Sequence, residues 1–248
     1  MSAAKSTRKS ATNRTVPVEL TAESLVGVAV FRRLSATSRG ELAALCQGRR
    51  YAAQQRVLSH KDDSGDVYFI ISGKVRVTIY SVGGKEITFR DQAAGEMFGE
   101  LGAIDGEPRS AHVMALEDSL LASMSREKFW QVLGSYPEVA EFTLKRLATL
   151  VRLLSGRVFE FSTLAVRNRI HAELLRLARE HLQDGNTATI SPSPTHADIA
   201  SRISTHREAV TREYHDLVQA GIIDQRRGEL VIHDVARLET MVREVMGN

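Results

Sequence analysis

The chain has 248 residues, of which 43% are hydrophobic and 25% are charged. This is the composition of an ordinary globular protein, and the length suits one large domain or two small ones. The longest apolar runs are far short of the ~18 residues needed to span a bilayer, and no charged and then apolar leader opens the chain, so we expect a cytoplasmic protein with no membrane partner. The single cysteine, Cys46, excludes a disulfide framework and a cysteine-built zinc or iron–sulfur site within one chain. The net charge of +3 is modest, but the sequence pI of about 9.1 leaves nucleic acid open as a partner.

The first residues of the chain are basic and polar. Lys5, Arg8, Lys9 and Arg14 occur among Ser, Ala and Thr without any acid. Such a segment cannot bury enough apolar surface to fold, so we expect a disordered tail over residues 1–20.

The sequence pattern of the next part of the chain predicts a small β-domain. Residues 35–49 have the pattern of a short amphipathic helix, with Leu42 and Leu45 among alanines. Five strand-like runs then recur at short spacing, broken by Gly73 and by a hairpin turn at residues 81–85. They are Val67–Ile71, Val75–Tyr80, Glu86–Arg90, Ala111–Leu116 and Leu120–Met124. Regular short strands with glycine turns favour an antiparallel barrel or roll.

A long helix is predicted after Pro137, which is suited to the first turn of a helix. Seven of its residues are spaced alternately three and four positions apart: Leu144, Leu147, Val151, Leu154, Val158, Phe161 and Ala165. This heptad spacing is typical of a two-helix coiled coil, which predicts a parallel homodimer. The alternative is that the helix packs only on its own domain.

The last third of the chain has the layout of a winged helix-turn-helix. A helix is expected over residues 166–182 and a polar loop with a possible strand over 183–194. Two further helices are expected over 195–203 and 205–221, the first with Thr195 and Asp198 as a capping pair. Residues 222–234 read as a two-stranded hairpin that turns at Gly228. Ser204 lies at the tight turn where such motifs often carry glycine.

The stretch "EMFGELGAIDGEPRSAHV", residues 96–113, places Glu100 and Arg109 nine positions apart around a glycine-rich turn. It is either a solvated surface loop or a pocket for one small anion. A phosphodiester anion is bound well by a guanidinium with N–H and O–H donors beside it, and Ser110 follows Arg109 directly.

The second helix of the helix-turn-helix carries Arg207, Glu208 and Arg212 near its N-terminal half. Arg can donate two hydrogen bonds to guanine and Glu can accept one from cytosine, so these side chains suit base reading in the major groove. The alternative is an ion pair between Glu208 and Arg212 on a solvated face. Arg226 and Arg227 on the wing suit phosphate contacts.

In combination, "FGEL…PRSA", the heptad helix and "THREAVTR" resemble the cyclic AMP receptor protein branch of the bacterial Crp–Fnr transcription regulators, over roughly residues 25–235. The resemblance implies an α+β fold with an N-terminal cyclic-nucleotide-binding β-roll, a long dimerisation helix and a C-terminal winged helix-turn-helix. The corresponding domains are residues 21–137 for the roll, 138–165 for the coiled-coil helix and 166–248 for the DNA-binding domain.

The resemblance also implies roles for residues of the pocket. Gly99 and Glu100 match the residues that hold the ribose of a cyclic nucleotide, next to Leu101, and Arg109 and Ser110 match those that hold its phosphate. Leu154 and Ser155 match the base-reading pair of the long helix, where relatives selective for cyclic AMP commonly have Thr and then Ser. Leu154 removes a hydroxyl from this position, which leaves the identity of the base open. Cyclic AMP is the default effector, and cyclic GMP is its competitor.

For DNA, the resemblance implies a homodimer on palindromic TGTGA-type half-sites, with Arg207, Glu208 and Arg212 reading bases. Contact with RNA polymerase is expected by analogy with the family. The remaining residues expected at the double-stranded DNA are Thr195, Thr205, His206 and Thr211. The nucleotide is expected to bind between the roll and the long helix and to act on the DNA-binding domains through residues 164–167.

Rival functions have weaker support. The run "ISGKV" is no P-loop, because an earlier glycine is missing and Val75 replaces Ser or Thr, and His171 with Glu173 lacks the Pro-Cys-x-x-Cys of a deaminase, so we expect no enzyme. An effector-independent regulator and a haem- or redox-sensing member of the same superfamily remain the alternatives.

Overall fold

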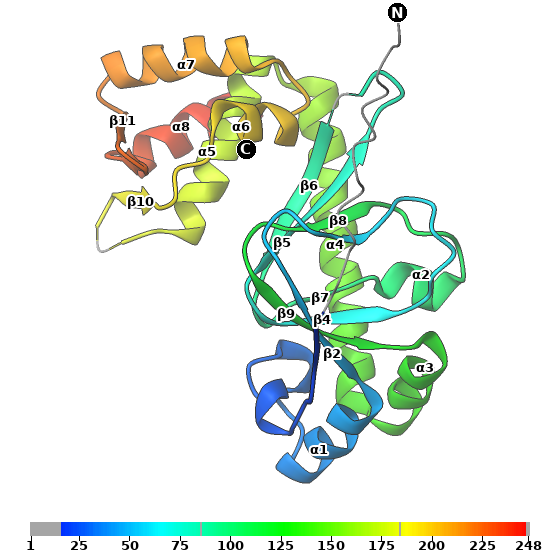
Figure 1. Cartoon of the computed structure of the whole chain (residues 1–248). Coiled ribbons are helices and arrows are strands. Elements are labelled where there is room, and N and C mark those ends of the chain that lie inside the picture. The colour runs from blue at the N-terminus through cyan, green and yellow to red at the C-terminus, as the bar shows by residue number, and fades with distance from the viewer. Residues whose placement is uncertain (1–15, 85, 184, 247–248) are drawn as a thin grey trace, which may run out of the picture. The chain divides into compact units, whose positions relative to one another are not determined.

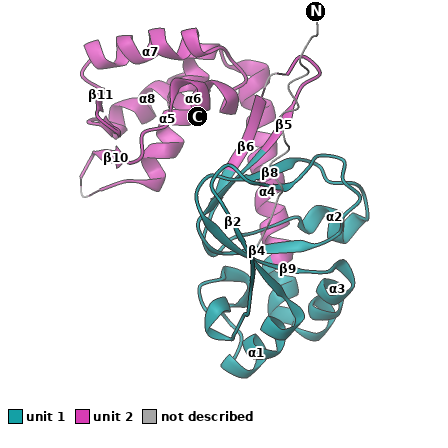
Figure 2. Cartoon of the chain, in the orientation of Figure 1, with its two compact units in different colours: residues 1–77, 91–142 teal, residues 78–90, 143–248 magenta. Residues whose placement is uncertain are grey.

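The computed structural model describes residues 16–84, 86–183 and 185–246. Contacts divide the chain into two compact units (Figure 2). The first contains the chain up to residue 77 together with residues 91–142, and the second contains residues 78–90 and 143–248. Most of the expected N-terminal tail lies outside the described residues. Its last part does not: Val16–Val18 form a strand, β1, so the tail does not extend through them.

The N-terminal β-roll contains two sheets (Figure 1). The five-stranded sheet has the order β1-β2-β9-β4-β7, and its neighbouring strands pair antiparallel. Besides β1 it contains β2 (Gln47–Tyr51), β4 (Val67–Ser72), β7 (Met97–Phe98) and β9 (Ser119–Met124). The four-stranded sheet has the order β3-β8-β5-β6 and contains β3 (Arg56–Leu58), β5 (Lys74–Tyr80), β6 (Glu86–Ala93) and β8 (His112–Ala115).

The strands form where β-branched and aromatic residues can be buried. Val67, Phe69 and Ile70 of β4 are fully buried, and the Phe69 ring packs 4.7 Å from that of Phe31. Short helices cover this core. They are the 3-10 turns Glu23–Leu25 and Ala29–Phe31 and the helices α1 (Ala36–Leu45), α2 (Glu100–Asp105) and α3 (Arg126–Ser135). The predicted β-roll architecture is confirmed, and each expected strand is present within a few residues of its predicted ends.

The helix expected over residues 35–49 was predicted too long. It ends at Leu45, and Gln47–Tyr51 form β2, which pairs with β1 on one side and β9 on the other. A Cβ atom at Gly48 would collide with the carbonyl oxygen of Val18, so this position requires glycine for the close approach of β1. Pairing with strands distant in sequence therefore overrides the local helical pattern.

The second unit contains most of the long helix and the winged helix-turn-helix. α4 runs from Pro137 to Thr163, beginning at the proline as predicted, and α5 (Val166–Glu180) follows after two residues. The remaining elements are β10 (Ala188–Ile190), α6 (His196–Arg202), α7 (Arg207–Gln219), β11 (Ile223–Arg226), β12 (Glu229–Ile232) and α8 (Val235–Met246). The three strands form one sheet of order β10-β12-β11. None of the helices in the described part of the chain is long and apolar enough to cross a membrane.

The helix-turn-helix is held together by an apolar core between its two helices. Ile199, Ile203, Val210 and Leu217 are all buried. The Thr195 hydroxyl accepts from the Asp198 backbone N–H at 3.1 Å, and the Asp198 carboxylate accepts from the Thr195 N–H at 3.0 Å, which is the reciprocal capping box. Helix α8 was not predicted; it packs Leu238 and Val242 into the same core.

Gly221 and Ser204, in two of the turns of this domain, lie in the left-handed region of the backbone. Gly221 ends α7 with φ of +70°, and the N–H groups of Gly221 and Ile222 donate to the carbonyls of Val218 and Leu217 in a Schellman motif. Ser204, in the turn between α6 and α7, has φ of +54°. A side chain in this region crowds the backbone, which glycine avoids.

We predict that Ser204→Gly raises the free energy of unfolding by about 0.5–1 kcal/mol, because it removes the strain of a left-handed non-glycine residue. Chemical denaturation of the full chain measures this. The matched control is Gly221→Ala, which introduces the same strain and should lower stability by about 1 kcal/mol. A loss of stability in Ser204→Gly would contradict the prediction.

Candidate functional sites

The predicted anion cassette forms a compact loop around a short helix in the first unit. β7 ends at Phe98, Gly99 takes φ of +84°, and α2 begins at Glu100. Gly106 ends α2 with φ of +81°, and the chain then returns to Arg109 and Ser110 before β8. The segment from Glu100 to Arg109 is therefore one short helix and a loop between the strands β7 and β8.

Arg109 is the centre of this loop, and it is buried. Its Nε donates to the Ser64 hydroxyl at 2.9 Å, its Nη1 to the Gly99 carbonyl at 2.9 Å and its Nη2 to the Asp66 carbonyl at 2.7 Å. Its backbone also pairs with the same segment, since its N–H donates to the Asp62 carbonyl and its carbonyl accepts from the Lys61 N–H. Arg109 thus fastens residues 61–66 to the start of α2.

The guanidinium has capacity beyond these bonds. It carries five N–H groups, and the three bonds use one on each nitrogen, so each terminal nitrogen has a second N–H beyond these bonds. Burial lowers the pKa of Arg109, and the nearby Tyr68 and the acidic residues Asp66, Asp62 and Glu100 oppose that shift. Arginine titrates so far above neutral pH that the group remains a cation.

Gly99 is required by this arrangement. A Cβ atom there would lie 2.8 Å from the Asp66 carbonyl oxygen and 2.9 Å from Arg109 Nη1. Any side chain would therefore displace Arg109 from the carbonyl that it binds. The other expected residues of the cassette differ in exposure: Glu100 is buried, whereas Leu101 and Ser110 are exposed.

The expected base-reading pair lies in the second unit. Leu154 and Ser155 occupy exposed positions of α4, and 40% of the surface of Leu154 is accessible. The structure therefore brings Gly99, Glu100, Arg109 and Ser110 together in one loop, and it places Leu154 and Ser155 on the long helix.

The expected DNA-reading residues lie at the start of α7. Arg207, Glu208, Thr211 and Arg212 are all exposed within its first two turns, and His206 is the exposed N-cap residue. Thr205 lies in the turn, where its N–H donates to the Ala200 carbonyl. Thr195 is exposed, but its hydroxyl is engaged in the capping box of α6.

The wing carries the two expected phosphate-binding arginines. Arg226 ends β11 and donates from Nε to the Asp224 carboxylate at 3.0 Å, in an exposed ion pair. Arg227 follows in the turn with Gly228 and is exposed. Because Asp224 partly neutralises Arg226, we expect Arg227 to carry more of the positive potential of the wing.

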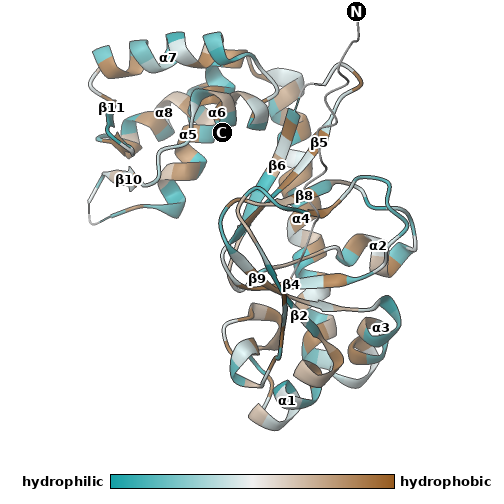
Figure 3. Ribbon diagram, in the orientation of Figure 1, coloured by the Kyte–Doolittle hydropathy of each residue, from teal (hydrophilic) through white to brown (hydrophobic). Residues whose placement is uncertain are grey.

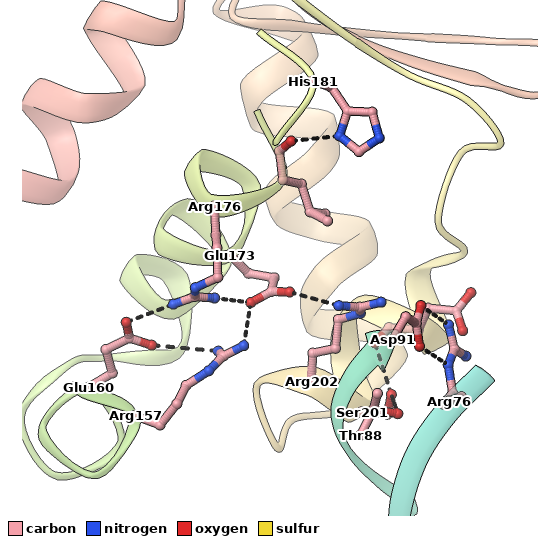
Figure 4. A network of polar contacts seen from close by, with 12 residues as sticks. Arg76, Thr88, Asp91, Arg157, Glu160, Glu173, Arg176, His181, Ser201 and Arg202 are labelled. Carbon is pink, nitrogen blue, oxygen red and sulfur yellow. Dashed lines mark hydrogen bonds and ion pairs between the residues drawn. The ribbon is translucent and has the colours of Figure 1, made fainter. Parts of the chain in front are cut away.

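A buried ionic cluster, which the sequence did not reveal, joins three helices of the second unit (Figure 4). Glu173 of α5 is almost completely buried, and it contacts Arg157 of α4 at 2.8 Å, Arg202 of α6 at 3.5 Å and Arg176 of its own helix. Glu160 of α4 accepts from Arg176 at 2.8 Å. These charged residues belong to no recognisable sequence motif, and the arginines lie 3 to 29 residues from Glu173. Their spacing in the sequence therefore did not predict the cluster.

The state of Cys46 and the arrangement of metal-binding side chains bear on the redox-sensing alternative. Burial raises the pKa of the Cys46 thiol to about 12, so it stays protonated at neutral pH rather than forming the thiolate that binds metals. Within residues 16–84, 86–183 and 185–246, no cluster of three or more His, Cys, Asp or Glu residues could hold a metal ion.

Comparison with known proteins finds one family model that matches the β-roll and another that matches the helix-turn-helix. The family model of the cyclic nucleotide-binding domain matches residues 48–136, and that of the Crp-like helix-turn-helix domain matches residues 168–241. The cyclic AMP receptor protein of Thermus thermophilus is 32% identical over 192 residues, which cover 77% of this chain and 86% of that protein. The chain belongs to the Crp–Fnr family of transcription regulators. It therefore combines a cyclic nucleotide-binding domain with a helix-turn-helix domain for DNA, and the expectation that it is no enzyme is confirmed by these matches.

One curated relative and two solved structures match most of the length of this Crp–Fnr regulator. The CRP-like cAMP-activated global transcriptional regulator of Mycobacterium tuberculosis is 25% identical over 222 residues, 89% of this chain and 99% of that protein. The structure of a CooA mutant from Carboxydothermus hydrogenoformans matches with a TM-score of 0.74 at 18% identity, over 92% of this chain and 98% of that one. The structure of CLP from Xanthomonas campestris, described as c-di-GMP responsive, matches with a TM-score of 0.68 at 22% identity, over 80% and 99%. These two structures show the shared fold.

We predict that Arg109→Ala destabilises the regulator by about 2–4 kcal/mol even without any ligand, because it leaves three oxygen acceptors without their donor. Urea denaturation measures the loss. The control is Arg32→Ala, which removes an exposed arginine of the same unit and should change stability by less than about 0.5 kcal/mol. Equal stability of the two variants would show that Arg109 serves no structural role.

Proposed function

We propose that this Crp–Fnr regulator is a homodimer that binds palindromic TGTGA-like DNA in response to a cyclic nucleotide, with cyclic AMP as the effector. The observation that carries the proposal is the buried Arg109, held next to Gly99 and Ser110 inside the matched cyclic nucleotide-binding domain. Relatives named for cyclic AMP support this choice of effector.

In this proposal each part of the nucleotide has its own residues. The ribose is held by Gly99 and by Glu100, whose carboxylate accepts from the 2′-hydroxyl, next to Leu101. The second N–H groups of Arg109 and the exposed Ser110 hydroxyl hold the cyclic phosphate. Leu154 and Ser155 contact the base. Since Leu154 has no hydroxyl with which to read adenine, cyclic GMP is the competing effector.

The dimer proposal rests on the exposed apolar stripe of α4; Figure 3 colours this helix, like the rest of the described chain, by hydropathy. Leu144, Val151 and Val158 expose 67%, 63% and 64% of their surface, although they are large apolar side chains at heptad positions. Leu154 and Phe161 continue the stripe. Exposed apolar residues at this spacing are buried when two such helices pair, which favours a second copy of the chain as their partner.

On the DNA, Arg207, Glu208 and Arg212 read base edges in the major groove while Arg226 and Arg227 contact phosphates. Thr195, Thr205, His206 and Thr211 border the same surface. The Glu173 cluster links α4 to α6, and it offers a route by which nucleotide binding at the long helix reaches the helix-turn-helix. RNA polymerase is a further partner by analogy with the family.

We expect isothermal titration of the full chain to give binding heat with cyclic AMP and weaker or no heat with cyclic GMP. Ser110→Ala should weaken nucleotide binding about tenfold, because it removes one hydrogen bond to a charged phosphate. Ser135→Ala, an exposed serine at the end of α3, is the control and should bind normally. Heat with cyclic GMP alone would reassign the effector, and no heat with either nucleotide would refute the pocket.

We expect Arg207→Ala to relax base preference at one position of each half-site, with a loss of about 1–3 kcal/mol of discrimination. Arg226→Ala should weaken binding to all duplexes equally and make it less dependent on salt. Fluorescence anisotropy with a palindromic duplex and its single-base variants distinguishes these results. Identical behaviour of the two variants would refute the division between base reading and phosphate contact.

A further inference from the structure

We propose that His196 is a positioning residue for DNA reading, which orients Thr211 on the reading helix and ties this helix to the wing. The inference rests on the proposed function of α7 in binding DNA. His196 was not among the residues that the sequence pointed to, because the capping pair Thr195 and Asp198 on either side of it assigns no role to the residue after the N-cap.

One imidazole ring joins three elements of the domain. His196 is the first residue of α6 and is half-buried. Its Nδ1 lies 2.8 Å from the Thr211 hydroxyl on α7, and its Nε2 lies 2.9 Å from the side-chain nitrogen of Gln225 on β11. The ring also packs edge-on against Tyr214 of α7, with 4.7 Å between the ring centroids. Both ring nitrogens therefore form hydrogen bonds, one with the reading helix and the other with the wing.

The protons of this chain of hydrogen bonds can be placed. An amide nitrogen only donates, so Nε2 of His196 accepts from Gln225 and carries no proton. Nδ1 then carries the proton of the neutral ring and donates it to the Thr211 oxygen. The Thr211 hydroxyl in turn donates to the Arg207 carbonyl at 3.1 Å. Burial, and next the positive charge of Arg207, lower the pKa of His196, which agrees with a neutral ring.

This arrangement decides which part of Thr211 is available to DNA. Its hydroxyl both donates and accepts within the protein, toward Arg207 and His196. The side chain is nevertheless exposed, between the proposed base readers Arg207 and Arg212. Its methyl group is therefore the part left for an apolar contact, and the matching group in the major groove is the C5-methyl of thymine.

The same ring sets the wing relative to the reading helix. Gln225 precedes Arg226 on β11, so its bond to His196 fixes the strand that carries a proposed phosphate contact. Loss of His196 would free the Thr211 hydroxyl to turn outward and release the wing strand from α7. We therefore expect it to change which duplexes are preferred, in addition to the total affinity.

The test uses the full chain with saturating cyclic AMP, and again with cyclic GMP, on a palindromic duplex with TGTGA half-sites. Each thymine of the half-sites is replaced in turn by deoxyuridine, which removes only the C5-methyl group. Fluorescence anisotropy should show that the wild type loses affinity about threefold or more at one thymine position. Thr211→Ser, which deletes only the methyl, should bind the thymine and deoxyuridine duplexes equally.

The decisive variant is His196→Phe, which keeps a ring against Tyr214 but removes both hydrogen bonds. It should also lose the preference for thymine, and adding Thr211→Ser to it should cause no further loss. His233→Phe is the matched control, an exposed histidine after β12 in the same unit, and it should retain the preference. Thermal unfolding of each variant measures stability separately.

Two results would overturn the inference. One is a wild type that binds the palindrome but shows no preference at any thymine. The other is a His196→Phe variant that keeps the wild-type preference, including one that weakens binding to all duplexes by the same factor, because that is the behaviour of a purely structural residue. A wild type that does not distinguish the palindrome from a scrambled duplex would instead refute the proposed DNA reading itself, on which the inference depends.

Discussion

A buried carboxylate constrains the second unit of this regulator. Glu173 is removed from water, and a lone buried charge is strongly unfavourable, so the fold must bring cations to it. Arg157, Arg176 and Arg202 come from α4, α5 and α6, and they can all reach Glu173 only when these helices keep one mutual arrangement. Buried ion pairs contribute little net stability, but breaking one is costly, so the cluster favours a single geometry.

The Glu173 cluster suggests how the proposed nucleotide binding at α4 acts on the helix-turn-helix. Arg157 lies on the same helix as Leu154 and the exposed apolar stripe, while Arg202 is the last residue of α6, directly before the turn to the reading helix. A nucleotide or a second subunit that acts on α4 would therefore act on packed, charged neighbours of the helix-turn-helix. Such a continuous set of contacts is what coupling between two sites requires, and a coupling measurement decides whether it is used.

Arg109 plays a comparable part in the first unit. The side chain that is proposed to hold the cyclic phosphate also binds Ser64, Asp66 and Gly99, so in this proposal one residue serves both the fold and the site. The sequence motif around Gly99, Arg109 and Ser110 led to the prediction of phosphate binding, since a guanidinium near glycine and serine suits a phosphate. The hydrogen bonds of Arg109 to Ser64 and Asp66 could not be predicted, because these residues lie more than forty positions away in the sequence.

The sequence by itself predicted the order of the β-roll, the long helix and the helix-turn-helix, the positions of most strands and helices, and the candidate residues of the cassette and the reading helix. These follow from local patterns: strand-forming runs between glycines, heptad spacing after Pro137, and the capping pair of Thr195 and Asp198. Only the tertiary structure decided that residues 47–51 are a strand, that Glu173 binds three arginines, and that His196 joins Thr211 to Gln225. Local preferences depend on neighbours along the chain, whereas strand pairing and the neutralisation of buried polar groups depend on residues that only folding brings together.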